Sequence, residues 1–269
     1  MRVLVTGATG SVGRLVVDHL LARGAPQVRA LTVDPERAAL PAQVEVVRGT
    51  VTQPSVLREA LRGVDRLYLA PAPATAQRVV TAARRAGVRR VVDLSGEPDS
   101  WWGSVAAAVE AGGVPWTHLW PWDFMENALL WAPQIREHGT VREPWPQAAS
   151  APVAMDDIAA VAAAVLLGEG HEGRAHTLTG PQVLTRRELA AALGRALGRE
   201  VPFVQVGRQE AIAVLAASTG ENAGWYVDTV LAGFAAGGAS TSSVVQEVLG
   251  RPATTFARWA HQHADDFRG

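Results

Sequence analysis

Short apolar runs alternate with helical patterns along the first half of the chain. Continuous apolar runs are typical of parallel strands that are buried on both faces, with helices covering the sheet. The order is that of an α/β, doubly wound (Rossmann) parallel sheet, in which ligands bind at the carboxyl ends of the strands. The predicted strands are Arg2–Thr6, Gln27–Thr32, Val44–Val47, Arg66–Ala70, Arg90–Leu94 and Trp116–Trp120. The predicted helices between them are Val12–Arg23, Pro54–Arg62, Thr75–Ala86 and Trp102–Ala111.

The pattern changes after Pro121, where helices predominate. Thr185 and Glu188 have the spacing of a capping box and predict the start of one of these helices. We therefore divide the single chain into a dinucleotide-binding core, residues 1–121, and a small mixed substrate-binding lobe, residues 122–269, packed on the core. The predicted elements of the second half are helices Phe124–Glu137, Asp156–Leu167 and Arg186–Leu197, with strands Ala175–Leu178 and Val201–Val206.

Three glycines spaced three apart follow the first strand and lead directly into a helix. Gly7 allows a sharp turn, Gly10 allows the backbone to approach a pyrophosphate, and Gly13 allows the helix to pack closely on the sheet. The helix then offers free N–H groups and its positive dipole end to the anion. Tight turns also need glycine for purely structural reasons. Strand, glycines, helix and second strand together nevertheless predict a dinucleotide site.

The composition excludes several other classes of protein. All 25 basic residues are arginine, cysteine is absent, and the formal net charge is −1. No thiolate chemistry, disulfide or cysteine metal site is possible, we expect no metal, and nothing indicates nucleic-acid binding. The chain begins in a core strand, and its alanine-rich stretches are short. We therefore expect no signal peptide, no membrane association and a cytoplasmic protein.

Several stretches resemble the NmrA-like branch of the atypical short-chain dehydrogenases/reductases, in an order that covers nearly the whole chain. They are residues 6–13, 28–35, 46–49, 94–95, 124–127, 157–159, 178–181, 249–252 and 255–267. The resemblance implies NAD(P)H-dependent reduction of quinones, ketones or enones, or redox sensing without turnover. The cofactor is thus expected to be NADP or NAD.

The adenosine end of the cofactor departs from the family pattern. An arginine that often holds the 2′-phosphate of NADP is Val33 here, and an acidic residue expected to contact adenine is Thr50. Asp34 lies where a carboxylate meets the ribose of NAD, whereas Arg37 is placed to reach a phosphate. Asp34 before Pro35 also fits a helix cap. The choice between NAD and NADP therefore stays open.

The nicotinamide end is expected near Ala70 and Pro71, although prolines there also suit a rigid turn. With the residues above, the candidate cofactor-binding set is Gly7, Thr9, Gly10, Ser11, Val12, Gly13, Asp34, Arg37, Ala70 and Pro71.

A tyrosine activated by a lysine four residues on is usual in short-chain dehydrogenases. This chain has two tyrosines, Tyr68 and Tyr226, and no lysine for either. General acid catalysis is worth about 10²- to 10⁴-fold, so its loss is a handicap that positioning of the reactants can offset. We expect an acceptor that polarises itself, either a quinone or an aromatic ketone with a neighbouring phenol.

Two polar residues are candidates for contact with the reacting groups. Ser95 follows the fifth strand, where the family places a hydroxyl that faces substrate or cofactor, although it also suits a strand end. Asp123 is placed to accept a substrate hydroxyl or to cap the following helix. Asp93 stands where many relatives carry lysine, and His118 is expected to be a hydrogen-bonded core residue.

Nine tryptophans accompany the two tyrosines. Flat indole rings suit a flat polycyclic ligand, but they also fill a core built of alanine and valine. We expect Trp102, Trp122 and Phe124 to contact substrate. The tryptophans near the predicted crevice are Trp101, Trp102, Trp120, Trp122, Trp131 and Trp145.

The sequence therefore predicts an NAD(P)H-dependent reductase acting on the carbonyl or quinone of a bulky aromatic small molecule, such as a secondary metabolite. A non-catalytic NAD(P)-sensing regulatory protein is the alternative. The oligomeric state is not defined by the sequence.

Overall fold

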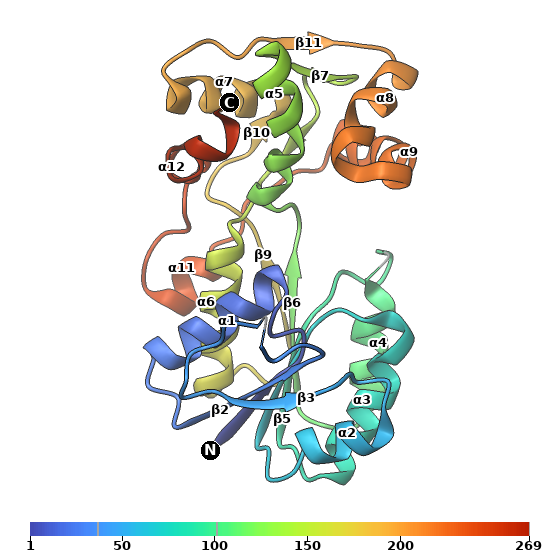
Figure 1. Cartoon of the computed structure of the whole chain (residues 1–269), viewed down its shortest axis with the longest axis vertical. Coiled ribbons are helices and arrows are strands. Elements are labelled where there is room, and N and C mark those ends of the chain that lie inside the picture. The colour runs from blue at the N-terminus through green and yellow to red at the C-terminus, as the bar shows by residue number, and fades with distance from the viewer. Residues whose placement is uncertain (37, 101, 269) are drawn as a thin grey trace. The chain divides into compact units, whose positions relative to one another are not determined.

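The computed structural model of the protein describes residues 1–36, 38–100 and 102–268. They form two compact units, which the chain enters more than once. Unit 1 comprises Met1–Pro121, Met155–Leu178 and Val244–Arg251, and unit 2 comprises Trp122–Ala154, Thr179–Ser243 and Pro252–Gly269. Unit 1 contains the strands of the central sheet (Figure 1).

A seven-stranded sheet in the order β3-β2-β1-β4-β5-β6-β9 forms the centre of unit 1, and all its strand pairs are parallel. The predicted doubly wound sheet is thereby confirmed, since the order reverses at β1 and β4. Its strands are β1 (Arg2–Val5), β2 (Gln27–Thr32), β3 (Glu45–Arg48), β4 (Arg66–Leu69), β5 (Arg90–Leu94), β6 (Trp116–Pro121) and β9 (Arg174–Leu178).

Helices cover both faces of this sheet (Figure 1). One face packs in an apolar cluster with α2, α3 and α4, and the other carries α6, with α1 packed against it. The helices of unit 1 are α1 (Ser11–Ala22), α2 (Pro54–Ala60), α3 (Pro73–Arg85), α4 (Gly103–Ala111), α6 (Met155–Leu167) and α11 (Val244–Leu249).

The division at 121/122 differs from the units in two segments. Met155–Leu178 and Val244–Arg251, which we assigned to the C-terminal lobe, belong to unit 1. The physical reason lies in burial, because nine of the thirteen residues of α6 are buried. Its small alanine side chains let α1 approach one side and the sheet the other, and β9 then pairs with β6.

Unit 2 has two apolar clusters of its own and only short strands. The capping box at Thr185 and Glu188 is confirmed, but the expected helix Phe124–Glu137 begins as a 3₁₀ helix and becomes α-helical only at Ala132. Its helices are η1 (Met125–Trp131), α5 (Ala132–His138), α7 (Arg186–Leu197), α8 (Arg208–Thr219), η2 (Gly220–Asn222), α9 (Ala223–Trp225), the π-helical η3 (Tyr226–Leu231), α10 (Ala232–Ala236), α12 (Phe256–Gln262) and η4 (Ala264–Phe267). Its strands are β7 (Val141–Glu143), β8 (Ala149–Ser150), β10 (Leu184–Thr185) and β11 (Phe203–Gln205).

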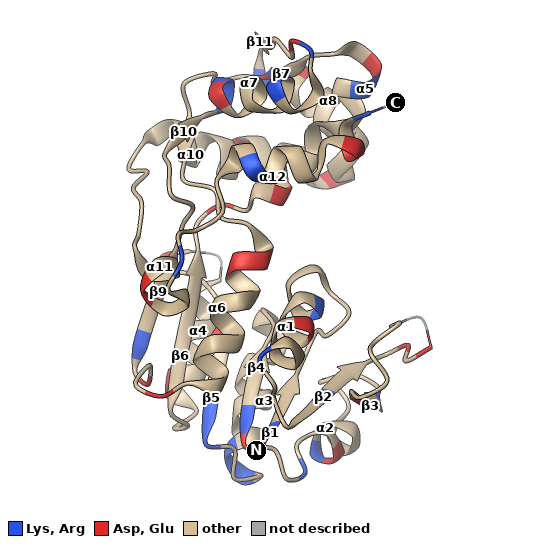
Figure 2. Ribbon diagram, turned by 90° about the vertical axis from the view of Figure 1, so that its left-hand side faces the viewer, with Lys and Arg blue, Asp and Glu red and all other residues tan. Residues whose placement is uncertain are grey.

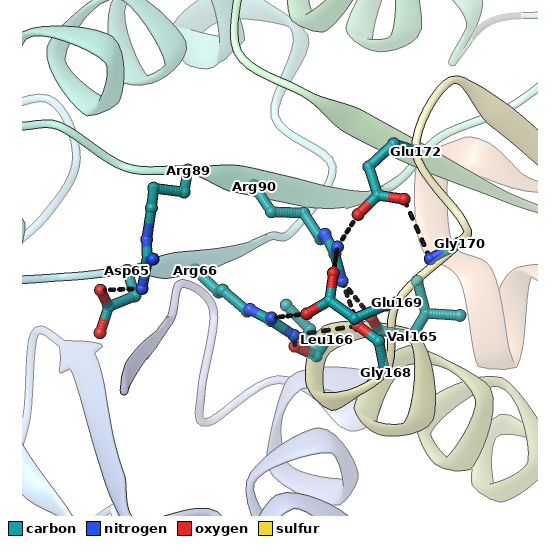
Figure 3. Close-up of polar contacts among 10 residues, drawn as sticks. All are labelled: Asp65, Arg66, Arg89, Arg90, Val165, Leu166, Gly168, Glu169, Gly170 and Glu172. Atoms are coloured by element: carbon teal, nitrogen blue, oxygen red, sulfur yellow. Dashed lines mark hydrogen bonds and ion pairs between the residues drawn. The ribbon is translucent and has the colours of Figure 1, made fainter.

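Paired charges occupy the amino-terminal edge of the sheet in unit 1 (Figure 3). Arg90 is 5 % exposed and donates to the Val165 and Gly168 carbonyls at the end of α6, while its guanidinium also contacts Glu169 at 2.5 Å. Arg66 donates to the same helix end and to Glu169. Two arginines thus satisfy helix carbonyls that have no partner within the helix. Elsewhere, acidic and basic segments are interspersed in both units (Figure 2).

Candidate cofactor and active site

The turn from β1 to α1 has the backbone that its glycines predict. Gly7 adopts a φ of +61°, and a Cβ there would lie 2.7 Å from the Cβ of Ala70. A Cβ on Gly13 would lie 2.0 Å from the carbonyl oxygen of Gly7, within the backbone itself. These two glycines are therefore required by the fold of the turn.

Gly10 differs from the other two glycines. It occupies the N-cap of α1 with a φ of −77°, and a Cβ there would meet only the Gly7 oxygen, at 3.3 Å. Internal packing therefore demands glycine less strongly here than at Gly13. Gly10, Thr9 and Ser11 are exposed, and Val12 and Gly13 are buried in the first turn of a twelve-residue helix. The exposed backbone at a helix N-terminus fits the pyrophosphate of a dinucleotide.

A cavity of about 330 Å³ opens beside this turn, at the carboxyl ends of β1, β2 and β4. Its position matches the cofactor crevice of a doubly wound sheet. The candidate residues Gly7, Thr9, Ala70 and Pro71 line the cavity. The other lining residues are Thr6, Leu31, Thr32, Val33, Gly49, Thr50, Val51, Leu69, Ala72 and Thr75.

Thr6 links the two central strands at this edge. Its hydroxyl donates to the Tyr68 carbonyl at 3.1 Å and accepts from the Ala70 N–H at 2.9 Å. Our sequence reasoning missed Thr6 and Thr32 as cavity residues. The signal was a threonine directly after β1 and another at the last position of β2.

Asp34 follows β2, and its backbone N–H donates to the Thr32 hydroxyl at 3.3 Å. We expected Asp34 to cap a short helix, but the described residues that follow it, Pro35, Glu36 and Ala38, form a turn. Arg37 lies outside the described residues, so both assignments at the ribose end stay predictions. Thr50 lines the cavity, and its hydroxyl accepts from the Thr52 N–H at 3.0 Å.

Ser95 lies at the end of β5, beside Trp120 of β6. The indole Nε1–H of Trp120 donates to the Ser95 hydroxyl oxygen over 3.1 Å. Two residues earlier on each strand, Asp93 and His118 form a fully buried pair with 2.6 Å between Oδ2 and Nδ1. The prediction that His118 is a hydrogen-bonded core residue is confirmed.

Asp123 lies in unit 2 and is 2 % exposed. Its carboxylate accepts from the Asn127 amide at 2.8 Å and from the Ser150 hydroxyl at 2.7 Å. Phe124 rather than Asp123 occupies the N-cap position of η1, so the capping alternative is wrong. Burial raises the pKa of Asp123, and the nearby Arg186 guanidinium opposes that rise.

A second buried polar group lies in unit 2. Arg186 donates two hydrogen bonds of 2.9 Å to Glu143, and the indole of Trp131 donates to the same carboxylate at 2.7 Å.

Both tyrosines of the chain are buried. Burial raises the pKa of Tyr226, which belongs to the π-helical η3. Tyr68 in unit 1 is fully buried, and burial likewise raises its pKa.

The described tryptophans range from fully buried to half exposed, with Trp120 and Trp145 in between. Trp131 is fully buried in unit 2, whereas Trp102 in unit 1 is 42 % exposed and Trp122 in unit 2 is 38 % exposed. Phe124 is partly exposed in unit 2, and Trp101 lies outside the described residues. Contact of these rings with a ligand stays a prediction. The structure places Ser95 and Trp102 in unit 1, and Asp123, Trp122 and Phe124 in unit 2.

A glycine turn, a helix N-terminus and a cavity at the switch point of a doubly wound sheet define a dinucleotide-binding protein. Residues 7–169 match the model of the NAD(P)H-binding family. The chain belongs to this family, within the NmrA-like atypical short-chain dehydrogenases/reductases.

Two curated relatives match almost end to end. The chain is 41 % identical to (4-alkanoyl-5-oxo-2,5-dihydrofuran-3-yl)methyl phosphate reductase of Streptomyces griseus, over 98 % of this chain and 99 % of that protein. It is 35 % identical to the NAD(P)H azoreductase of Xenophilus azovorans, over 98 % and 99 %.

A solved structure agrees with these relatives. The NADPH-dependent quinone oxidoreductase of Escherichia coli, complexed with NADPH, superposes with a TM-score of 0.87 and 27 % identity. The match covers 97 % of this chain and 99 % of that one. The predicted class of NAD(P)H-dependent oxidoreductase, with NADP or NAD as cofactor, is thereby confirmed.

Over the described residues, no helix combines the length and apolar character needed to cross a membrane.

Proposed function

We propose that the protein reduces a flat, conjugated small molecule, a quinone or an aromatic ketone with a neighbouring phenol, without a tyrosine–lysine pair. When bound, NAD(P)H supplies the hydride. The protein contributes the binding edge, the orientation of the acceptor and a hydrogen-bond donor at Ser95.

One observation carries the proposal. The chain has no lysine, and Tyr68 and Tyr226 are 0 % and 7 % exposed, with their pKa values raised by burial. Burial disfavours the phenolate that proton donation leaves, and at Tyr226 the nearby Arg186 guanidinium offsets this rise in pKa only in part. The acceptor itself must therefore delocalise the charge that forms on it, as a quinone or an internally hydrogen-bonded ketone does.

The aromatic nature of the substrate is supported by exposed rings. Trp102 and Trp122 are 42 % and 38 % exposed, and flat indole rings that are accessible in this way suit stacking on a flat ligand. Trp102 of unit 1 and Trp122 and Phe124 of unit 2 are each a proposed substrate contact. Asp123 already holds Asn127 and Ser150, so we assign it to positioning these side chains.

A second candidate substrate is an unsaturated lactone. The Streptomyces griseus relative, at 41 % identity, is named for a ring double bond conjugated with two carbonyl groups. Such a ring also delocalises the negative charge that hydride addition creates, without a proton donor. It is the kind of small molecule that occurs among secondary metabolites.

The test follows the loss of NADPH and NADH absorbance, separately, with a panel of acceptors. The panel holds quinones, polycyclic hydroxy-ketones, their phenol-deleted partners and alkanoyl lactones. We expect turnover with a quinone or hydroxy-ketone and a large loss when the phenol is deleted. Unchanged turnover after that deletion contradicts the ketone version, and turnover with lactones alone selects the second candidate. Binding of cofactor without consumption across the panel contradicts the proposal and favours a sensor.

A further inference from the structure

The Ser95 hydroxyl is restricted in how it can form hydrogen bonds. A serine hydroxyl has one hydrogen to donate and two lone pairs to accept with. The Trp120 indole N–H, at 3.1 Å, donates to one of these lone pairs. No acceptor for the hydroxyl hydrogen is found among residues 1–36, 38–100 and 102–268. Since Ser95 is only 4 % exposed, this hydrogen has little solvent to bond with either.

The indole that makes this contact is itself held in place. Trp120 stacks on His118 with 5.9 Å between ring centroids and 8° between planes. On its other side His118 stacks on Trp116 at 4.0 Å and 17°. The imidazole is fixed in turn by Asp93, at 2.6 Å, with both side chains fully buried. The indole N–H therefore keeps its direction toward Ser95.

The hydroxyl lies at the cofactor edge of the sheet. In the pairing of β4 with β5, Leu69 is opposite Asp93, and Ser95 follows β5 at the same edge at which Ala70 and Pro71 follow β4. Pro71 lines the cavity described above. A hydrogen that has no protein acceptor thus lies at the edge where the dinucleotide site opens.

We propose that Trp120 is a positioning residue that orients the Ser95 hydroxyl, so that Ser95 donates its hydrogen bond to the carbonyl oxygen of the acceptor. This inference rests on the proposed reductase function. Ser95 keeps its proton throughout, and the proton that completes the reduction comes from solvent. In this proposal Trp120 acts through Ser95.

The first test is a double-mutant cycle with the whole protein. Trp120→Phe removes the indole N–H and keeps a ring on His118. We expect kcat to fall about three- to tenfold, the range for one neutral hydrogen bond, with KM for the cofactor unchanged. Ser95→Ala should lower kcat by about a hundredfold, as for loss of a donor to a developing oxyanion. The double variant should match Ser95→Ala alone. A Trp120→Phe effect that persists in the Ser95→Ala background overturns the proposal.

Trp116→Phe is the matched control, because Trp116 stacks on the other face of the same imidazole. We expect it to leave kcat unchanged while altering the thermal midpoint as much as Trp120→Phe does. An equal loss of kcat in both variants means that packing on His118, rather than the Ser95 contact, controls the rate, and it contradicts the proposal.

A spectroscopic readout separates this inference from the proposed function. The Trp120 indole N–H resonance is identified by its absence in Trp120→Phe. We expect it to shift in Ser95→Ala and again when NADPH and a non-reducible carbonyl analogue bind, while the Trp116 resonance stays in place. An unmoved Trp120 resonance overturns the inference even if the enzyme turns over. A shifted resonance in a protein that reduces nothing supports the contact and contradicts only the proposed function.

Discussion

The two edges of the sheet in unit 1 satisfy their polar groups in opposite ways. At the amino-terminal edge, Arg66 and Arg90 are bonded to helix carbonyls and to Glu169. At the carboxyl-terminal edge, Gly10 presents an exposed helix N-terminus, and Ser95 has a hydrogen for which the described residues offer no acceptor. At the first edge, charged side chains are paired with one another and with helix carbonyls, whereas the second edge leaves a helix N-terminus and a hydroxyl hydrogen for a ligand. The binding edge of this sheet is therefore marked by neutral donors rather than by charge.

The largest effect is expected at Gly13. Gly13→Val places a Cβ 2.0 Å from the Gly7 oxygen, and neither backbone can yield without moving the turn. We expect a loss of about 3 kcal/mol or more in the free energy of unfolding, together with loss of cofactor binding. Urea denaturation and cofactor fluorescence measure the two effects. A stable variant that binds normally would show that the turn is not needed for the site.

Arg90→Met tests the other edge. The variant removes the donor to the Val165 and Gly168 carbonyls and the contact with Glu169, and we expect a loss of about 2–4 kcal/mol of stability with unchanged cofactor affinity. Arg89→Met is the control, because Arg89 is 72 % exposed and pairs with Asp65, so its loss should cost about 0.5 kcal/mol or less. Weaker cofactor binding in Arg90→Met alone would break the distinction between the edges.

Gly10→Ala should show the reverse pattern. Its Cβ meets one atom, the Gly7 oxygen, at 3.3 Å, so the loss of stability should be much smaller than at Gly13. Cofactor affinity should fall about tenfold or more because the methyl occupies the space for the pyrophosphate. Gly207→Ala is a matched control, because Gly207 is also a helix N-cap, with a φ of −72° and nothing near a Cβ. Equal affinity in both variants would argue against a dinucleotide at Gly10.

The smallest effect concerns pH. Arg90 and Arg66 hold the pKa of Glu169 below its ordinary value of 4.5. Its ionised form therefore stabilises the fold above pH 4.5, and this contribution is lost as the pH falls through the lowered pKa of the folded state. We expect the urea midpoint of Glu169→Gln to fall less between pH 5 and pH 3 than that of the natural chain. The difference should shrink in an Arg90→Met background, and a difference that persists there contradicts the pairing.

The local signals in the sequence predicted much of unit 1. The first six strands, the glycine turn and the capping box at Thr185 follow from residues close together in the chain. The missed features depend on contacts between distant residues. Asp123 is bonded to Ser150, 27 residues away, and no local pattern indicates such a partner. The Trp120–Ser95 contact follows only from the register that places Leu94 opposite Leu119.

The interleaving of the two units has a consequence for how such a protein diversifies. The chain passes between units at 121/122, 154/155, 178/179, 243/244 and 251/252. β9, the last strand of the sheet, is added only after the chain has formed part of unit 2. Unit 2 is therefore not one continuous stretch of sequence that could be exchanged in a single step. Exchange of unit 2 as a whole requires the replacement of three separate segments, because segments of unit 1 lie between them in the chain.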